Sequence, residues 1–264
     1  MKKYLVIGNP INHSYSPQLH NFWLKKYNIS GVYKKEKMET KDLKNLILKI
    51  KNCEFSGVNV TVPFKKEIIP FLDKLSFEAE KTQSVNTIYL NDNKIIGHNT
   101  DIEGFESAIN NIGYDINGKT ILILGSGGVV PSIIFALNKM KASKIIIMNR
   151  TRAKADALNN LFDNLLIVDW GNLPNFDMII NATSLGLNSK DEINLDFSKF
   201  EKGKFFYDVI YNPNETNFLK KAKLMGNKIE NGKKMFIYQA AAAFNIWHNV
   251  YPKIDNEIEK LLEK

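Results

Sequence analysis

A glycine cluster between two apolar segments is the feature that most restricts how this chain can fold. An apolar run at 121–124 leads into Gly125-Ser126-Gly127-Gly128, followed by an apolar helical stretch and a second strand at 145–148. Strand, glycine-rich turn, helix and strand in about thirty residues predict a mononucleotide-binding βαβ unit. Such glycines let backbone N–H groups approach a pyrophosphate at the N-terminus of the following helix. Taken alone, the glycines are weak evidence, and the alternative is a simple tight turn between strand and helix.

The residues after the second strand indicate which nucleotide fits. NAD-binding folds usually have an acid about twenty residues past the glycines. This chain instead has Asn149, Arg150, Thr151 and Arg152. These two arginines are the only ones among 36 Lys and Arg residues, which leaves 34 lysines. Because a guanidinium suits forked phosphate recognition, we predict NADP, with the 2′-phosphate on Arg150 and help from Arg152 or Lys154. The alternative is a solvated basic loop.

Composition excludes several classes of protein. With 264 residues and 44% hydrophobic content, the chain can bury a large core, and we expect two domains. We expect no signal peptide and no membrane span, and the single Cys53 suits a reducing compartment, so we predict a cytoplasmic protein. The net charge of +8 comes from lysines spread along the whole chain, which argues against nucleic acid as a partner. The four histidines lack metal-ligand spacing, so we predict no metal.

Strands alternate with helices both before and after the glycine cluster, which predicts an α/β fold with mainly parallel sheets. The segments 85–90 and 94–96 indicate a hairpin, and 65–72 a helix. Apolar helices at 235–248 and 254–262 need a surface to cover, so we expect them to return to the first lobe. The prediction is a two-lobed protein with a cleft between the lobes. Residues 1–103 and 235–264 form an N-terminal α/β substrate domain, and 104–234 a Rossmann-type dinucleotide-binding domain.

Lys65 and Asp101 are the strongest candidates for chemistry. Lys65 follows a buried strand that carries Thr61, and ligands of open α/β sheets bind at the C-terminal ends of strands. Asp101 opens a helix after another strand. If the two side chains meet, they form a pair that can hold a substrate hydroxyl, with Lys65 as proton donor or acceptor. The alternatives are an ordinary surface lysine and a plain helix N-cap.

Other polar residues occupy positions suited to ligands. Ser14 and Ser16 lie two apart in a stretch that we expect to be extended, so both hydroxyls should face one way, with Ser16 as a helix cap. Together they suit a carboxylate. Asn86 begins a strand as a polar contact or a turn, and Gln239 interrupts an apolar helix. Thr183 ends a strand where a loop would face the cofactor, and Tyr211 follows another strand.

Together these segments resemble the shikimate dehydrogenase family. The matching motifs are GNPINHSYSP (8–17), SGVNVTVPFKK (56–66), SVNTIY (84–89), GHNTDIEGF (97–105), GSGG (125–128), NRT (149–151), INATSLG (180–186), YDVIYNP (207–213) and NGKKMFIYQAA (231–241). They follow the family's order along nearly the whole chain. The resemblance implies reversible reduction of 3-dehydroshikimate to shikimate by NADPH.

The resemblance also implies a role for each matched residue. Lys65 and Asp101 would be the catalytic pair, and Ser14, Ser16 and Tyr211 would bind the substrate carboxylate. The ring hydroxyls would contact Thr61, Asn86, Asp101 and Gln239. The residues implied to bind NADP are Gly125, Ser126, Gly127, Gly128, Asn149, Arg150, Thr151, Arg152, Lys154, Thr183 and Gly232.

The chain departs from the family pattern at His98, Val130, Pro131 and Lys234. Two other functions stay open at this point. One is a quinate/shikimate dehydrogenase, and the other is a non-catalytic relative that senses a substrate or nucleotide. The small-molecule substrate is the expected partner, and the expected assembly is a monomer or homodimer.

Overall fold

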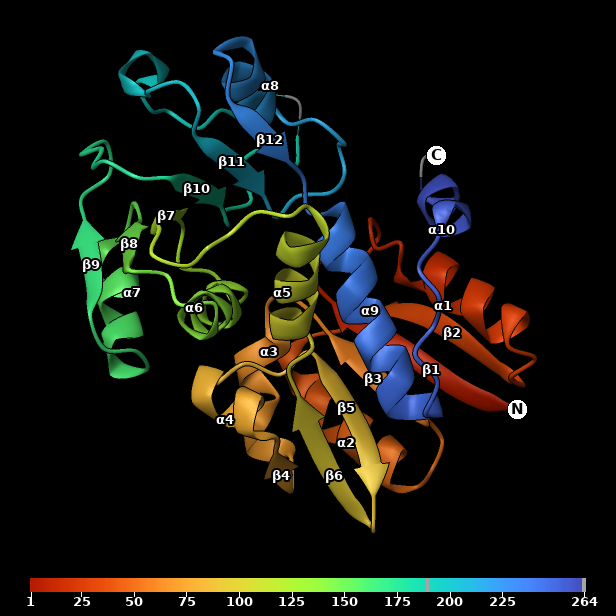
Figure 1. The fold of residues 1–264 in the computed structure, drawn as a ribbon. Coiled ribbons are helices and arrows are strands. Elements are labelled where there is room, and N and C mark those ends of the chain that lie inside the picture. Colours follow the sequence, from red (N-terminus) through yellow and green to blue (C-terminus); the bar gives the residue numbers. More distant parts are fainter. Residues whose placement is uncertain (189, 263–264) are drawn as a thin grey trace. The chain divides into compact units, whose positions relative to one another are not determined.

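The structure is a computed structural model that describes residues 1–188 and 190–262, and the chain divides into two compact units (Figure 1). The first unit combines Met1–Gly104 with Ile237–Lys264, and the second is Phe105–Phe236. The predicted boundaries, after residue 103 and before residue 235, lie within two residues of these. The functional roles assigned to the two domains stay predictions.

The first unit is built on a mixed sheet. Its strands in the described part of the chain are β1 (Lys2–Gly8), β2 (Gly31–Lys37), β3 (Gly57–Val60), β4 (Lys74–Leu75), β5 (Thr87–Asn91) and β6 (Lys94–His98), in the spatial order β2-β1-β3-β5-β6-β4. The pairs β1–β2, β1–β3 and β4–β6 are parallel, whereas β5 runs antiparallel to β3 and β6. A two-residue turn with Asp92 and Asn93 at φ 48° and 58° closes the predicted hairpin, and such a turn joins only antiparallel strands.

Helices of several lengths cover this sheet. They are α1 (Ser16–Lys26), α2 (Leu43–Lys51), α3 (Phe64–Glu67), α4 (Phe77–Thr82), α10 (Asn256–Leu261) and the 3₁₀ helices η1 (Thr40–Asp42) and η2 (Ile69–Phe71), while α5 (Asp101–Asn111) and α9 (Lys233–His248) each carry the chain from one unit into the other. The predicted helix at 65–72 is wrong as a single element. Pro70 has no N–H to donate and disfavours helical geometry before it, so the segment splits into α3 and η2.

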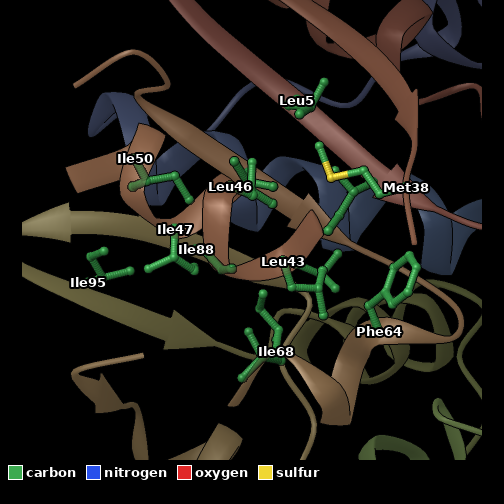
Figure 2. Close-up of a cluster of buried hydrophobic side chains, with 14 of the residues drawn as sticks. Leu5, Met38, Leu43, Leu46, Ile47, Ile50, Phe64, Ile68, Ile88 and Ile95 are labelled. Atoms are coloured by element: carbon green, nitrogen blue, oxygen red, sulfur yellow. The ribbon is translucent and has the colours of Figure 1, made fainter. Parts of the chain in front are cut away.

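Alternation along the strands sends different side chains to the two faces of the sheet. On one face, Leu5 on β1 and Ile88 on β5 pack with the apolar stripe of α2, formed by Leu43, Leu46 and Ile50 (Figure 2). On the other face the core is aromatic: the ring of Tyr4 lies 5.2 Å from that of Trp247 on α9. The i, i+3, i+7 spacing of the stripe explains why 43–51 forms a helix here.

The C-terminal helices belong to the first unit, as predicted. Trp247 donates its indole N–H to the Ile88 carbonyl over 3.2 Å, which ties α9 to the sheet. Phe244, also on α9, is fully buried and lies edge-on to Trp23 of α1. Near α10, Lys26 of α1 pairs with Glu257 at 2.7 Å. The aromatic face of the sheet is therefore completed by the last part of the chain.

The second unit has the strand order of a dinucleotide-binding fold. Its strands are β7 (Thr120–Leu124), β8 (Lys144–Met148), β9 (Leu165–Val168), β10 (Met178–Asn181), β11 (Phe205–Asp208) and β12 (Lys228–Glu230), all parallel, in the order β12-β11-β10-β7-β8-β9. Numbered from β7, this is the order 3-2-1-4-5-6 of the Rossmann fold. The predicted βαβ unit is confirmed, and the order reverses between β7 and β10, which are neighbours.

The helices of the second unit are α6 (Val130–Lys139), α7 (Arg152–Asp156), α8 (Asn217–Leu224), η3 (Ala157–Asn160) and η4 (Phe197–Lys199). Buried strands β7 and β8 are continuous apolar runs, as expected for a parallel sheet covered on both faces. Among residues 1–188 and 190–262, no helix is long and apolar enough to cross a membrane.

Candidate active site

Lys65 and Asp101 form a buried ion pair in the first unit. Lys65 is the second residue of α3 and Asp101 the first residue of α5, and the two side chains are only 10% and 8% exposed. The Lys65 ammonium donates to Asp101 Oδ2. The alternative of an ordinary surface lysine is therefore wrong for Lys65. The carboxylate of Asp101 therefore balances the charge of the ammonium inside the first unit.

Asn86 joins this pair to two further residues. Its Oδ1 accepts the Thr100 backbone N–H over 2.8 Å, and its Nδ2 donates to Asp101 Oδ1 over 2.9 Å. The same Nδ2 lies 3.4 Å from Oε1 of Gln239, which α9 supplies. Asn86 is 3% exposed, so it is a buried polar contact rather than a turn residue. Four predicted substrate and catalytic residues thus meet within the first unit.

Ser14 and Ser16 lie together, but not in the way predicted. The Ser14 hydroxyl donates to Ser16 Oγ over 3.2 Å, so the hydroxyls are adjacent. The backbone between them is not extended, because Tyr15 has φ −89° and ψ 1°. The residues before them form a turn in which the Ser14 N–H bonds to the Ile11 carbonyl. Ser16 is the first residue of α1 rather than its cap; Tyr15 is the N-cap, and no side chain caps there. Instead, Ser14 Oγ accepts the Ser16 backbone N–H over 3.3 Å.

Thr61 and Tyr211 lie in loops of different units. Thr61 follows β3, is half-buried, and its carbonyl accepts the Phe64 N–H over 2.9 Å. Tyr211 follows β11 in the second unit, where its ring stacks on that of Phe236 with centroids 4.5 Å apart. Because Ser14 and Ser16 belong to the first unit, the assignment of Tyr211 to the same carboxylate stays a prediction.

The glycine turn after β7 meets the end of β10 at the reversal of strand order. Gly125 has φ +106°, and a Cβ there would lie 3.0 Å from the Ala182 carbonyl oxygen and the Thr183 side chain. Only glycine fits without strain. Gly127 and Gly128 are exposed, and α6 begins at Val130. Bare backbone at the start of a ten-residue helix fits the predicted pyrophosphate.

Pro131 and Val130, which depart from the family pattern, are the first two residues of α6. Proline is tolerated there because N–H groups of the first turn have no partner within the helix. Ser126 is half-buried in the same turn.

The basic residues after β8 differ in their surroundings. Arg150 is exposed and forms no ion pair with any residue that the structure describes. Arg152 donates to Asp169 over 2.8 Å and lies 3.8 Å from Asp156. Asn149 donates its side-chain amide to the Thr151 carbonyl over 2.7 Å, which shapes the turn, and Lys154 is exposed on α7. Of the two arginines, Arg150 is the one free to bind a phosphate.

A second buried network, which sequence reasoning missed, holds the loop after β10. Asp208 is fully buried and accepts hydrogen bonds from Asn181 Nδ2, the Ile210 N–H and the Thr216 hydroxyl, at 3.1, 3.0 and 2.7 Å. Burial raises the pKa of Asp208 to about 6. Asn181 Oδ1 in turn accepts the Thr183 hydroxyl over 2.7 Å. The sequence did contain a signal for this network, namely an acid at the end of an apolar strand, within the motif at 207–213.

Gly232 and Lys234 lie near the start of α9. A Cβ at Gly232 would lie 2.1 Å from the Val209 carbonyl oxygen, so backbone packing alone requires glycine there. Lys234, another departure from the family pattern, lies 4.0 Å from Glu230 of β12. His98, the remaining departure, lies 3.9 Å from Glu78 of α4.

The sequence as a whole is similar to those of known proteins. The chain is 56% identical over 262 residues to the shikimate dehydrogenase (NADP(+)) of Pelagibacter ubique, covering 99% of both proteins. The chain belongs to the shikimate dehydrogenase family. The family model for the shikimate dehydrogenase substrate binding domain matches residues 6–88, and that for shikimate / quinate 5-dehydrogenase matches residues 106–209.

Solved shikimate dehydrogenases share the fold over the full length. The crystal structure of the Aquifex aeolicus shikimate dehydrogenase has a TM-score of 0.93 at 34% identity and covers 100% of this chain and 98% of that one. The Thermus thermophilus shikimate 5-dehydrogenase, in complex with NADP(H) and shikimate, has a TM-score of 0.90 at 30% identity, with 99% and 98% covered. The resemblance inferred from the motifs is therefore confirmed at the level of the family.

Proposed function

We propose that this chain catalyses the reversible NADPH-dependent reduction of 3-dehydroshikimate to shikimate, a step toward the aromatic amino acids. The observation that carries the proposal is the buried Lys65–Asp101 pair with the Asn86 amide against it. A binding module has no need of an ammonium held beside a carboxylate, whereas reduction of a ketone requires a proton donor. The names and bound ligands of the family members support the same reaction.

In the proposed mechanism Lys65 supplies the proton. A bound NADPH supplies the hydride to the ring carbonyl carbon. As the carbonyl oxygen gains negative charge, the Lys65 ammonium donates a proton to it, which completes the hydroxyl. Asp101 holds the ammonium in place and stabilises its charge before the transfer. In the reverse direction the neutral amine of Lys65 would accept the hydroxyl proton, and the bound cofactor would take up the hydride.

The remaining polar residues of the first unit are proposed to hold the substrate. Ser14 and Ser16 bind the carboxylate, joined by Tyr211 of the second unit. Asn86 and Gln239 lie around the catalytic pair, which suits them to the ring hydroxyls. Thr61 and Asp101 complete this proposed set. The first unit is thus proposed as the substrate domain and the second as the NADP domain.

NADP is the proposed cofactor. The proposal is supported by the exposed glycines before α6, which leave room for a pyrophosphate. It is also supported by the Arg150 guanidinium, which has no ion-pair partner among residues 1–188 and 190–262. Four neighbours in the sequence belong to the same proposed set: Asn149, Thr151, Arg152 and Lys154. The set also includes Thr183, which lies against Gly125, and Gly232, which precedes α9. The proposed cofactor set therefore keeps every predicted residue, with Arg150 as its main phosphate ligand.

Oxidation of shikimate in the presence of NADP⁺, followed through the absorbance of the reduced nicotinamide, tests the proposal. We expect activity in the wild type, a loss of at least about a hundredfold in Lys65→Ala, and normal activity in Lys66→Ala. Lys66 is the matched control, since it is the exposed neighbour on the same helix. Undiminished turnover in Lys65→Ala would refute the proton-transfer role. Shikimate binding without turnover in the wild type would instead favour the sensing relative.

Quinate is the second substrate to assay, because the matching family model is described as shikimate / quinate 5-dehydrogenase. Comparable activity on quinate would favour the broader enzyme. The cytoplasm stays the predicted compartment, supported by the single cysteine. A monomer or homodimer stays the predicted assembly.

A further inference from the structure

A series of polar side chains, all buried except the first, crosses the otherwise apolar and aromatic core of the first unit. We call it the Tyr33 series, and its members in order are Ser14, Ser16, Tyr33, Asn59, Thr87, Asn86 and Asp101. Its first two members are the proposed carboxylate ligands, and its last belongs to the proposed catalytic pair. None of the roles assigned above uses Tyr33, Asn59 or Thr87.

The direction of the central hydrogen bonds follows from Asn59. Its side-chain amide lies 3.0 Å from the Asn86 carbonyl, which can only accept, so Nδ2 faces that carbonyl. Nδ2 also donates to Thr87 Oγ1 over 3.1 Å. Oδ1 is therefore the atom that faces Tyr33, whose hydroxyl donates to it over 2.6 Å. Burial raises the pKa of Tyr33 well above its usual value, so the phenol keeps this proton.

An independent observation gives the direction of the hydrogen bonds at the Asp101 end of the Tyr33 series. The Thr100 backbone N–H can only donate, so the atom of Asn86 that it meets is Oδ1. Nδ2 of Asn86 therefore faces the Asp101 carboxylate. Thr87, which accepts from Asn59, donates its own proton to Asn86 Oδ1 over 3.0 Å. From Tyr33 onward, every donor points toward Asp101.

The direction of the hydrogen bonds at the serines follows in the same way. Because Tyr33 gives its only proton to Asn59, its hydrogen bond with Ser16 must receive the Ser16 proton. Ser16 in turn accepts from Ser14. Ser16 has one proton, which it can give either to Tyr33 or to a substrate carboxylate. Binding of a carboxylate at Ser16 thus removes a donor from Tyr33 but leaves the Tyr33–Asn59 bond in place.

Tyr33 and Asn59 are placed to orient other residues rather than to contact substrate. Tyr33 is 2% exposed, and its ring is stacked on that of His20 with centroids 4.2 Å apart. Asn59 is 7% exposed, and the two bonds from Nδ2 use both of its N–H donors. In a core of this kind an unpaired polar group is costly, so each link holds the next amide in one orientation.

We propose that Tyr33 is a positioning residue for the reaction, acting through Asn59 and Thr87. Its hydroxyl acts with the Asn86 carbonyl to orient the Asn59 amide, and Asn59 orients Thr87. Thr87 then acts with the Thr100 N–H to hold the Asn86 amide in the orientation that meets Asp101. This inference rests on the proposed function, because it concerns the alignment of the same catalytic pair. Tyr33 acts on the chemical step rather than on substrate affinity.

Tyr33→Phe tests the role, with Tyr4→Phe as its matched control. Tyr4 lies in the same aromatic core at 2% exposure, and its hydroxyl bonds to Ser56, outside the Tyr33 series. We expect Tyr33→Phe to lower kcat about tenfold, the effect of losing one well-placed buried hydrogen bond. The KM for shikimate should not rise, because Ser16 keeps its proton for the carboxylate. Tyr4→Phe should leave both constants unchanged at a similar melting temperature.

Thr87 offers a second pair of variants should Tyr33→Phe fold poorly. Thr87→Val removes the hydroxyl that joins Asn59 to Asn86, and Thr87→Ser keeps it. We expect the same fall in kcat for Thr87→Val and near-normal kcat for Thr87→Ser. Normal kcat in Thr87→Ser would show that the hydroxyl is what matters. If only the bulk of the side chain mattered, Thr87→Val would keep kcat and Thr87→Ser would not.

The outcomes separate this role from the proposed function. A wild type that oxidises shikimate, with unchanged kcat in Tyr33→Phe and Thr87→Val, overturns the positioning role alone. A loss confined to KM, or an equal loss in Tyr4→Phe, overturns it too. A wild type that does not oxidise shikimate overturns the proposed function and this role with it.

Discussion

Arg152 donates to the carboxylate of Asp169 over 2.8 Å, and this ion pair makes the two arginines of the chain unequal. Asp169 follows β9, the neighbour of β8 in the sheet. A guanidinium already bound to a carboxylate must give up that partner before it can bind a phosphate. Arg150 has no such partner within the described part of the chain, and it is the residue that the sequence analysis chose for the 2′-phosphate.

We therefore predict that Arg150→Ala weakens NADP⁺ binding far more than Arg152→Ala does. Loss of one forked, charge-assisted contact should raise the KM for NADP⁺ by roughly 10- to 100-fold, and kcat should change little. The KM for NAD⁺, which lacks the 2′-phosphate, should stay the same in both variants. Steady-state kinetics with each nucleotide measures the difference. Equal effects of Arg150→Ala on both nucleotides would contradict the assignment.

The double variant Ser14→Ala plus Ser16→Ala should raise the KM for shikimate without a comparable loss of kcat. Removal of two hydroxyl donors to a carboxylate should raise KM by roughly 10- to 100-fold. Methyl shikimate provides the control substrate, because its ester carries no charge for the serines to bind. Its KM should be similar in the wild type and the variant. An unchanged KM for shikimate itself would remove both serines from the carboxylate site.

The raised pKa of Asp208 should make the free energy of unfolding depend on pH. Its folded-state pKa of about 6 lies above its ordinary value of 3.8, so the folded protein binds this proton more tightly than the unfolded chain does. The stability from this group is full below about pH 4 and is lost as the pH rises through about 6. The shift of roughly two units corresponds to about 3 kcal/mol.

Asp208→Asn removes this titration, because the amide imitates the protonated acid. From about pH 4 to about pH 7, the free energy of unfolding of the wild type should fall relative to the variant by about 2 kcal/mol, most of the full effect. Urea unfolding at several pH values measures the change. Asp115→Asn, at an exposed position, is the control and should run parallel to the wild type. Parallel curves for Asp208→Asn would mean that the fold does not raise the pKa of Asp208.

The long, strongly patterned elements were the ones that sequence predicted well. The apolar runs of β7 and β8 and the glycine turn between them had few other possible structures, and the spacing of Leu43, Leu46 and Ile50 allowed only a helix. Short elements such as β4 and α4 escaped prediction, because two to six residues carry too little periodicity. The helix expected at 65–72 failed because the effect of Pro70 was overlooked.

The candidate site was predictable where a motif named a residue, and less so where a partner was needed. Sequence selected Lys65 and Asp101, but their contact depends on how β3 and α5 lie in the first unit. Tyr33 escaped notice because it stands in a strand of mostly charged residues, as a lone aromatic at an edge. Its signal was that isolation, since an aromatic among exposed lysines marks the face that turns inward. The catalytic and binding roles, and the cleft between lobes, stay predictions.

The first unit is assembled from the two ends of the chain, and this has a consequence for synthesis. Residues 105–236 are one continuous stretch, so their sheet can be completed as soon as they leave the ribosome. The first unit must wait for Ile237–Lys264, and until then Tyr4 and Trp23 lack the aromatic rings of α9 that bury them. The part translated first is therefore the part finished last. During that interval the nascent chain carries an uncovered aromatic surface that chaperones can bind.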